Sequence, residues 1–175
     1  MTPLDGTEYT LTAGATAITL DSELGLRLME MLGATTWARG LSHGEVKAFT
    51  AFLGLYSFKK GAAIFAEGDL DCSMALVLTG RIEIRKGHDA SNPELVELDE
   101  IGPGQVFGEM AMLDGQPRSA SARAKEDVLL AVLLEERYQD LCAGDPALAL
   151  KLTRNIARVV SLRLRRTSDN LVRYL

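Results

Sequence analysis

Short apolar runs separated by turn residues occupy the middle of the chain, between about residues 55 and 134. Each run is four to seven residues long, and Gly-containing turns such as Lys60-Gly61 and Thr79-Gly80 lie between them. Many short strands with regular turn signals predict an all-β barrel or jelly roll. The expected strands are Leu55–Phe58, Ala63–Ala66, Met74–Leu78, Arg81–Arg85, Leu95–Leu98, Ser119–Arg123 and Val128–Leu134.

Helical periodicity appears on both sides of this region. Asp21 or Ser22 can cap a first helix, which Gly33 is expected to stop. Ser42-His43-Gly44-Glu45 is a capping box that begins a second helix, expected to end at Gly54. The apolar faces of these helices are Leu24, Leu28 and Met31 or Leu32 in the first, and Val46, Phe49 and Leu53 in the second.

After a short helix predicted at Glu135–Ala143, a much longer helix is predicted at the C-terminal end. Asp145 is an N-cap and Pro146 suits the first helical position, and neither Gly nor Pro follows. The residues from Pro146 to Asn170 would form a rod of about 38 Å. An apolar stripe along it must be buried against the strands or against a second copy. The stripe consists of Leu148, Leu152, Ile156, Val159, Leu162, Leu164 and Leu171.

These patterns predict a mainly β fold with flanking helices: a β-jelly-roll barrel, N-terminal helices and a long C-terminal helix. We expect three parts, which are an N-terminal extension with a helix (1–40), the barrel (41–144) and the long helix (145–175). The extension is either a partner-docking arm or packing material. A chain of 175 residues is long enough to bury a core of its own.

Composition narrows the expected location. The two cysteines, Cys72 and Cys142, do not make a disulfide framework. No apolar run approaches the roughly 20 residues that span a bilayer, and the N-terminus lacks the basic and apolar regions of a signal peptide. We therefore expect a cytoplasmic protein without a membrane partner.

Charge is distributed unevenly along the chain. The segment from Asp145 onward has seven basic and two acidic residues, whereas the whole chain has a net charge of −5. Such a segment binds nucleic acid or an anionic membrane, or forms the solvated face of a helix. The solvated face is favoured, because no aromatic stacking residues accompany the arginines.

The segment from Phe107 to Ala122 carries the most chemistry. Gly108 lets the backbone approach a ligand closely, because it has no Cβ. Glu109 begins a short apolar turn, and Arg118 follows with a planar set of donors that matches a phosphate. Ser119 adds a hydroxyl. This set suits one small molecule with a sugar hydroxyl and a phosphate.

This segment resembles the phosphate-binding cassette of the cyclic-nucleotide-binding domain family. Phe-Gly-Glu, a short apolar helix and Pro-Arg-Ser stand in family order, and phrases at 58–61, 64–69 and 78–84 resemble the family's barrel, so that the likeness covers about residues 41–170. It implies that Glu109 accepts a hydrogen bond from the ribose 2′-hydroxyl. It also implies that Arg118 pairs with the cyclic phosphate, with help from Ser119 and from amides near Gly108 and Met110. The alternative is a surface ion pair between Glu109 and Arg118.

The resemblance extends to the base. Thr167 and Ser168 match the place where the long helix of bacterial relatives contacts the purine, which favours adenine, although this chain has about one extra helical turn after Pro146. The alternative is two polar residues on a solvent face. Cyclic AMP is the expected ligand, and cyclic GMP stays open because Ser119 keeps a hydroxyl. Candidate apolar walls for the base, or plain core residues, are Ile84, Leu98 and Ile101, and Phe107 belongs to the site as the first residue of the cassette.

Catalysis is not expected. The only histidines, His43 and His88, cannot form a metal site of the kind seen in similar barrels, and no phosphate-binding Gly-rich loop with Lys-Ser or Lys-Thr is present. No metal is expected. The resemblance to bacterial regulators suggests a homodimer through the long helix. Those regulators continue into a helix-turn-helix domain, whereas this sequence stops at Leu175, so direct DNA binding is not expected.

The sequence therefore predicts a stand-alone cyclic-nucleotide sensor that relays binding through its C-terminal helix to an effector protein or a second subunit. The alternative is a degenerate member of the same fold that serves as a dimerisation or scaffold module without ligand.

Overall fold

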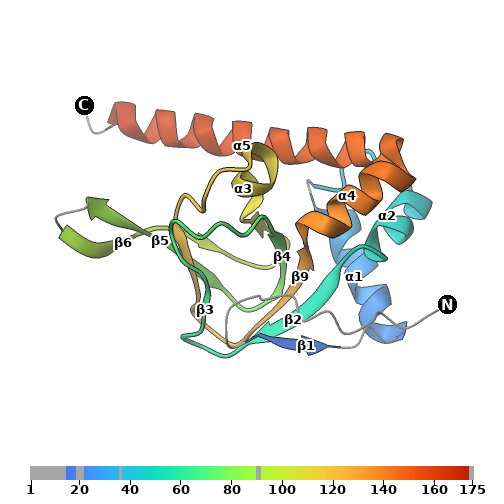
Figure 1. The fold of residues 1–175 in the computed structure, drawn as a ribbon, viewed down its shortest axis with the longest axis horizontal. Helices are drawn as coiled ribbons and strands as arrows, with labels where there is room; N and C mark the ends of the chain where they lie inside the picture. The colour runs from blue at the N-terminus through green and yellow to red at the C-terminus, as the bar shows by residue number, and fades with distance from the viewer. Residues whose placement is uncertain (1–14, 19–21, 36, 90–91, 174–175) are drawn as a thin grey trace.

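The computed structural model describes residues 15–18, 22–35, 37–89 and 92–173. In Figure 1 the strands form the body of the molecule, the long helix α5 (Pro146–Arg173) lies across the top, and α3 (Glu109–Asp114) sits between α5 and the strands. The helices α1 (Ser22–Ala34), α2 (His43–Thr50) and α4 (Glu135–Gly144) gather at the right-hand end in this view.

Two antiparallel sheets make up the β region. The first contains five strands in the order β1 (Thr16–Ile18), β2 (Gly54–Phe58), β9 (Val128–Leu133), β4 (Met74–Thr79) and β7 (Val106–Phe107). The second contains four strands in the order β3 (Ala63–Phe65), β8 (Ser121–Ala124), β5 (Ile82–Asp89) and β6 (Asn92–Ile101). The predicted jelly-roll fold with flanking helices is thus confirmed.

The expected barrel, however, is not closed. Within the described ranges no strand pair joins the first sheet to the second, so hydrogen bonds do not run continuously around the body. The two sheets meet through side chains, including Phe58 and Leu130 from the first sheet and Phe65 and Ile82 from the second. Burial of apolar side chains, rather than a complete ring of backbone pairing, therefore holds the layers together.

Strand alternation divides the interior into two cores. On β4, Met74, Leu76 and Leu78 pack beneath the helices, whereas Ala75 and Val77 face the other sheet. Successive side chains of a strand point to opposite faces. Because both faces of β4 are covered, its residues form a continuous apolar run instead of an apolar–polar alternation.

Two expected helix ends are wrong. The first helix continues through Gly33 to Ala34, because a glycine in the last turn costs helix stability without preventing the conformation. The second helix ends at Thr50, and Gly54 instead opens β2, where it pairs with Val132 of β9. Between Thr50 and Gly54, the amides of Ala51, Phe52 and Leu53 donate to carbonyl oxygens three residues back, so the chain tightens into turns before β2 begins.

The capping box that begins α2 is confirmed. The Ser42 amide donates to Glu45 Oε2 at 2.7 Å, and the Glu45 amide donates to Ser42 Oγ at 3.2 Å. Glu45 also pairs with Lys151 of α5 at 2.6 Å. One carboxylate therefore caps α2 and connects it to the long helix.

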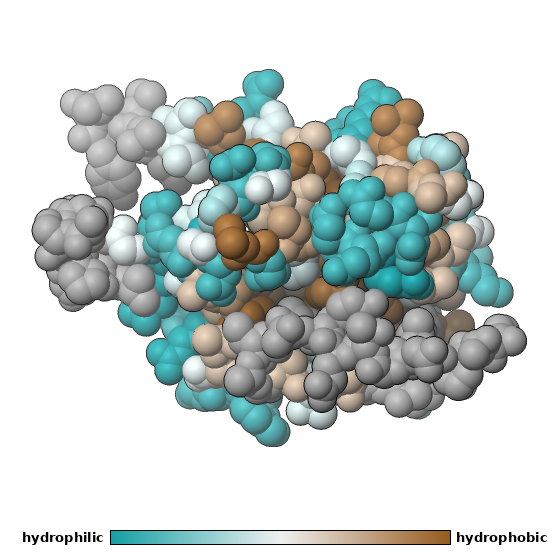
Figure 2. All heavy atoms as spheres, in the orientation of Figure 1, coloured by the Kyte–Doolittle hydropathy of each residue, from teal (hydrophilic) through white to brown (hydrophobic). Residues whose placement is uncertain are grey.

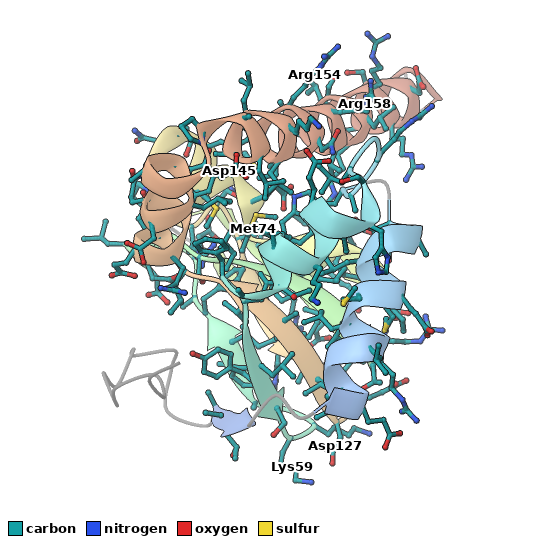
Figure 3. All side chains as sticks on the ribbon, turned by 90° about the vertical axis from the view of Figure 1, so that its right-hand side faces the viewer. Lys59, Met74, Asp127, Asp145, Arg154 and Arg158 are labelled. Carbon is teal, nitrogen blue, oxygen red and sulfur yellow. The ribbon has the colours of Figure 1, made fainter. Side chains whose placement is uncertain are left out.

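The N-terminal half of α5 is anchored, and its C-terminal half is exposed. The predicted cap is present, with the Leu148 amide donating to Asp145 Oδ1 at 3.0 Å. Asn155, itself buried, donates to the carbonyl oxygens of Trp37 and Arg39 at 2.6 and 2.9 Å. Farther along, Leu164 is 67% exposed. The anchored half also has an outer face, on which Arg154 and Arg158 are exposed (Figure 3).

A membrane crossing needs a helix that is both long and apolar. None of the described helices combines the length and hydropathy that a bilayer crossing requires. On the face drawn in Figure 2, the apolar groups are small and stand among hydrophilic side chains.

A pH-dependent contribution to stability is expected from Glu45. Its hydrogen bonds, first with Lys151 and then with Ser42, lower its pKa from 4.5 to about 2. A carboxyl group whose pKa is lower in the folded state stabilises the protein above its unfolded pKa, and this contribution disappears as pH falls through the folded pKa. Glu45→Gln keeps an acceptor for Ser42 but removes the charge. We expect a lower melting temperature at pH 7, and a difference from the parent that shrinks between pH 4.5 and 2.

Glu23→Gln is the matched control, because Glu23 pairs with Arg27 on the exposed surface of α1 at 3.1 Å. A surface pair of this kind contributes little. A Glu45→Gln difference that stays constant across this pH range would contradict the role assigned to Glu45.

Candidate ligand-binding site

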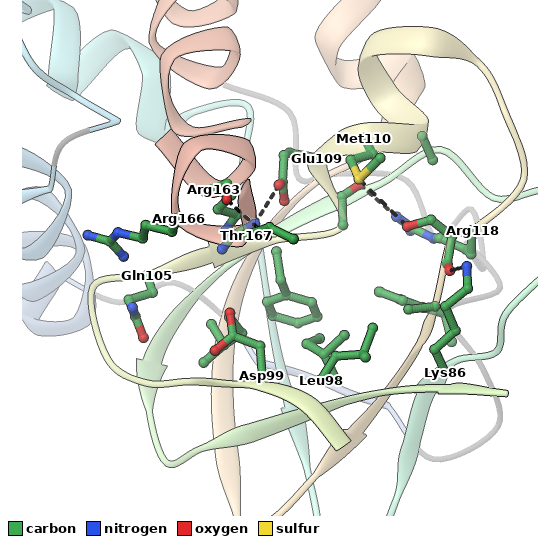
Figure 4. Close-up of a pocket in the computed structure, with 18 residues that line it drawn as sticks. Lys86, Leu98, Asp99, Gln105, Glu109, Met110, Arg118, Arg163, Arg166 and Thr167 are labelled. Atoms are coloured by element: carbon green, nitrogen blue, oxygen red, sulfur yellow. Dashed lines mark hydrogen bonds and ion pairs between the residues drawn. The ribbon is translucent and has the colours of Figure 1, made fainter. Parts of the chain in front are cut away.

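A cavity of about 520 Å³, here called the cassette cavity, lies beneath the middle of α5. Figure 4 shows Glu109, Met110 and Arg163 on its upper side, Arg118 at one end, and Leu98 and Asp99 on the side of the β5–β6 hairpin. The lining residues are Phe65, Ile84, Lys86, Leu98, Asp99, Ile101, Gln105, Phe107, Gly108, Glu109, Met110, Ala111, Arg118, Ser119, Ala120, Arg163, Arg166 and Thr167.

Arg118 is buried at one end of the cassette cavity, with 3% of its surface exposed. Its Nε donates to Asp71 Oδ2 at 3.1 Å, and its Nη2 donates to Asp71 Oδ1 and, at 2.7 Å, to Ser73 Oγ. Its Nη1 donates to the carbonyl oxygens of Ser73 and Gly108 at 2.6 and 2.8 Å. These contacts use all five N–H donors of the guanidinium group. The group also lies 4.1 Å from the centre of the Phe65 ring.

Gly108 is required where β7 passes into α3. Its φ of 77° lies in the left-handed region that L side chains avoid. A Cβ at this position would lie 2.7 Å from Arg118 Nη1 and 2.9 Å from the Ser73 carbonyl oxygen. The absence of a side chain therefore lets the backbone approach Arg118 closely enough for the Gly108 carbonyl to accept its hydrogen bond.

Glu109 faces the cassette cavity from the first turn of α3 and is 3% exposed. Arg163 of α5 donates to Glu109 Oε1 through Nη1 and to the Val106 carbonyl oxygen through Nη2. Figure 4 shows the two side chains directed toward each other. A buried carboxylate needs a partner, and this partner comes from the long helix. The ion pair consequently connects α5 to the segment that carries Gly108 and Arg118.

The hairpin contributes polar groups to the opposite side. Lys86 of β5 donates from Nζ to the Ser119 carbonyl oxygen at 2.7 Å, which places an ammonium beside the residue that follows Arg118. Asp99 of β6 is exposed, and Figure 4 shows it near the α5 side of the hairpin wall. The cavity thus has cations at the Arg118 end, whereas near α5 the carboxylates of Glu109 and Asp99 stand with the cations Arg163 and Arg166.

The structure brings ten of the eleven expected site residues to this cavity. They are Ile84, Leu98, Ile101, Phe107, Gly108, Glu109, Met110, Arg118, Ser119 and Thr167. Ser168 does not line it. The Ser168 and Thr167 hydroxyls both donate to carbonyl oxygens of their own helix, at 3.0 Å to Leu164 and 3.1 Å to Arg163.

Several lining or supporting residues escaped the sequence analysis. Arg163 stands one helical turn before Thr167, on the same face of the helix. Because Thr167 was expected at the site, Arg163 could have been expected there as well. Lys86 and Asp99 lie on the strands flanking the expected hairpin loop, where strand pairing determines which faces meet. Asp71 follows a turn and had no signal, because only the folded chain brings it to Arg118.

The arrangement is suited to binding a mixed ligand. Donors at the Arg118 end favour an anion, Glu109 accepts hydrogen bonds, and apolar side chains such as Leu98, which is 58% exposed, offer a surface for a flat ring. In the part of the chain that the structure describes, no three His, Cys, Asp or Glu residues are grouped to hold a metal ion.

Gly108→Ala is expected to damage the Arg118 end specifically. Gly115, at the other end of α3, has a similar φ of 65° and open space around its Cα, so Gly115→Ala is a matched control. The left-handed conformation costs an alanine about 1–2 kcal/mol at either position. Disturbing a buried hydrogen bond to a charged group adds about 1.5–3 kcal/mol for Gly108→Ala alone. Chemical denaturation measures both variants, and equal losses would contradict the close approach to Arg118.

Comparison with known proteins identifies relatives of this arrangement. A family model described as "Cyclic nucleotide-binding domain" matches residues 55–145. The chain is 35% identical over 126 residues to a protein named "Cyclic AMP receptor protein" from Thermus thermophilus, a match that covers 72% of this chain and 56% of that protein. It is 28% identical over 142 residues to a "CRP-like cAMP-activated global transcriptional regulator" from Mycobacterium tuberculosis, covering 81% of this chain and 61% of that one.

Solved structures give the same picture. A "cyclic nucleotide-binding domain" from Methylobacillus flagellatus has a TM-score of 0.81 at 23% identity, with 93% of this chain and 90% of that chain covered, which supports the fold. The catabolite activator protein of Thermus thermophilus has a TM-score of 0.69 at 32% identity, with 78% and 62% covered. The chain therefore spans less than two thirds of the length of the curated relatives named above.

Proposed function

The chain belongs to the cyclic nucleotide-binding domain family, and we propose that it binds cyclic AMP in the cassette cavity and passes the bound state to a partner through α5. Relatives named for cyclic AMP support the choice of ligand. The observation that carries the proposal is that Glu109 and Arg118, nine positions apart, line one cavity. A ribose and its cyclic phosphate would fit between them.

The phosphate is assigned to the Arg118 end. Asp71, whose side chain is 40% exposed, is the most accessible of the current partners of Arg118. A cyclic phosphate would take over donors now held by Asp71, because two anions repel each other around one guanidinium group. Ser119 and Lys86 stand beside this end and would add a hydroxyl and an ammonium. Binding would then require only that the Asp71 carboxylate move away from Arg118 as the cyclic phosphate arrives.

The ribose is assigned to Glu109 and the base to the hairpin side. Glu109 would accept from the 2′-hydroxyl while keeping its bond with Arg163. Leu98 and Ile84 would contact the purine face, and the Asp99 carboxylate would accept from an exocyclic amino group. Both adenine and guanine carry such a group, so cyclic GMP is the second ligand to be tested.

The relay is assigned to the Glu109–Arg163 pair. A ribose that bonds Glu109 would weaken or strengthen the bond between Glu109 and Arg163, and so would change which position of the C-terminal half of α5 is the most stable. The N-terminal half would stay in place, because Asn155 anchors it. Beyond this half, the exposed Leu162 and Leu164 offer an apolar strip for a second copy or an effector protein.

A ligand-free scaffold is the second candidate function. It is favoured by one observation, which is that the chain's own atoms satisfy every N–H donor of Arg118. Isothermal calorimetry with nucleotide-free protein separates the two functions. Saturable heat with cyclic AMP or cyclic GMP supports the sensor, and no heat with either supports the scaffold.

Arg118→Ala is expected to weaken cyclic AMP binding roughly 10- to 150-fold, because a charge-assisted bond to the phosphate is lost. Arg123→Ala is the control: Arg123 follows in β8, donates to the Gly61 carbonyl oxygen at 2.8 Å and does not line the cavity. Calorimetry at a temperature where both variants are folded, checked by circular dichroism, measures the dissociation constants. Parent-like affinity in Arg118→Ala would remove the phosphate assignment.

Glu109→Gln is expected to reduce the preference for cyclic AMP over its 2′-deoxy analogue, because a neutral amide oxygen accepts the 2′-hydroxyl more weakly than a carboxylate. The same variant should abolish the nucleotide-dependent change in amide hydrogen exchange around Arg163. Asp99→Asn removes a carboxylate from the same cavity and serves as the control, since it should keep the 2′-hydroxyl preference. An unchanged preference in Glu109→Gln would take Glu109 out of the ribose role.

A further inference from the structure

A second cavity, of about 550 Å³, lies beside the cassette cavity. It is formed by the end of α1, the turn that contains Trp37, the segment that leads into β7, and the middle of α5. Here it is called the Trp37 cavity. Arg163, Arg166 and Gln105 line both cavities and so form the wall between them.

The walls of the Trp37 cavity are mainly apolar, with positive charge at one side. Its large apolar lining residues are Met31, Trp37, Val106, Val159 and Leu162. Arg163 and Arg166 are the only ionisable groups among the described lining residues, so that no carboxylate opposes them. The cassette cavity differs because Glu109 and Asp99 line it.

Arg166 is the group most available to a ligand. Its side chain is exposed, and within the described ranges it forms no ion pair and no side-chain hydrogen bond. Arg163, in contrast, already bonds Glu109 and the Val106 carbonyl oxygen. A guanidinium at the edge of an apolar hollow is suited to one carboxylate or sulfonate group.

Trp37 forms a rigid wall of this cavity. Its ring meets Phe49 edge to face, with the centroids 4.9 Å apart, and its carbonyl oxygen accepts from Asn155 of α5. The indole Nε1 is buried and has no hydrogen-bond partner among the described residues. Trp37 is therefore held in place from two sides, and it contributes an apolar wall to the cavity rather than an exposed donor.

From these features we infer that the Trp37 cavity is a second binding site, for a small amphipathic anion with an apolar chain or ring and a single acidic group. Its volume lies in the range of small-molecule sites. The apolar body would lie against Val159 and Leu162, and the acidic group would pair with Arg166. A cyclic nucleotide does not suit this cavity, because no described wall residue offers a carboxylate to accept its ribose hydroxyl.

The protein carries its own probe for this site. Trp37 is the single tryptophan of the chain, and it lines this cavity but not the cassette cavity. Octanoate and octylammonium have the same apolar chain and opposite charge. We expect octanoate to change the Trp37 emission saturably, and octylammonium to bind at least about tenfold more weakly. No saturable change with octanoate, or equal affinity for both compounds, would overturn the inference.

Substitutions in the cavity wall test whether octanoate binds in the Trp37 cavity. Arg166→Gln should weaken octanoate binding about tenfold, whereas Arg165→Gln, which alters the adjacent exposed arginine that lines neither cavity, should leave it unchanged. Val159→Phe should abolish binding by filling the cavity. Ala34→Phe, at the end of α1, provides a second filling variant if Val159→Phe does not fold, as judged by circular dichroism. Full binding in a folded filling variant, or equal effects of the two arginine changes, would refute the site.

Two further measurements exclude other occupants. Saturating cyclic AMP should leave octanoate binding in place, and stoichiometric displacement would mean that octanoate enters the cassette cavity instead. Sedimentation should give the same oligomeric state with and without octanoate. Leu164→Arg, at an exposed residue that lines neither cavity, is the variant expected to dissociate a dimer formed through α5. If octanoate bound only to this variant, the cavity would be a contact between subunits, and the inference would be wrong. None of these readouts requires cyclic AMP to be the natural ligand.

Discussion

The buried guanidinium of Arg118 holds together the parts of the chain from which the site is built. It bonds the start of β4 through Ser73, the passage from β7 to α3 through Gly108, and the preceding loop through Asp71. These segments are distant in sequence, and a buried charge needs all of its donors satisfied. The position of Gly108 then determines where Glu109 begins its helix. One side chain thus fixes the geometry of the cassette and also supplies the charge that the proposed ligand would use.

This double role has a physical consequence for binding. A guanidinium group that is already satisfied cannot gain five new hydrogen bonds, so a phosphate contributes by replacing an existing partner. Asp71 is suited to be that partner, because its side chain is partly exposed and water can solvate the carboxylate when it leaves. The net affinity would then reflect how much more strongly Arg118 binds the phosphate than it binds the Asp71 carboxylate.

The long helix connects the two halves of the molecule unequally. Its first half is part of the core through Leu148, Leu152 and Ile156, and Asn155 and Lys151 attach it to the N-terminal helices. Its second half crosses the two cavities and contacts the cassette through Arg163. Under the proposed function, free energy from ligand contacts would shift the exposed half without unfolding the anchored half. Arg163 and Arg166 face both cavities, which makes this part of α5 the common wall of two proposed sites.

The sequence by itself determined the fold class, the caps at Ser42 and Asp145, and the cassette from Phe107 to Ser119, because these features depend on local periodicity, on capping side chains and on closely spaced residues. The expected ends of the first two helices were wrong, because α1 continues through Gly33 and because α2 gives way to tighter turns after Thr50, before β2 begins at Gly54. Only the tertiary structure decided that Asp71 and Ser73 satisfy Arg118, that Arg163 pairs with Glu109, and that the sheets do not close. Those pairings join residues between 45 and 54 positions apart, and no local pattern specifies which distant groups a compact chain brings together.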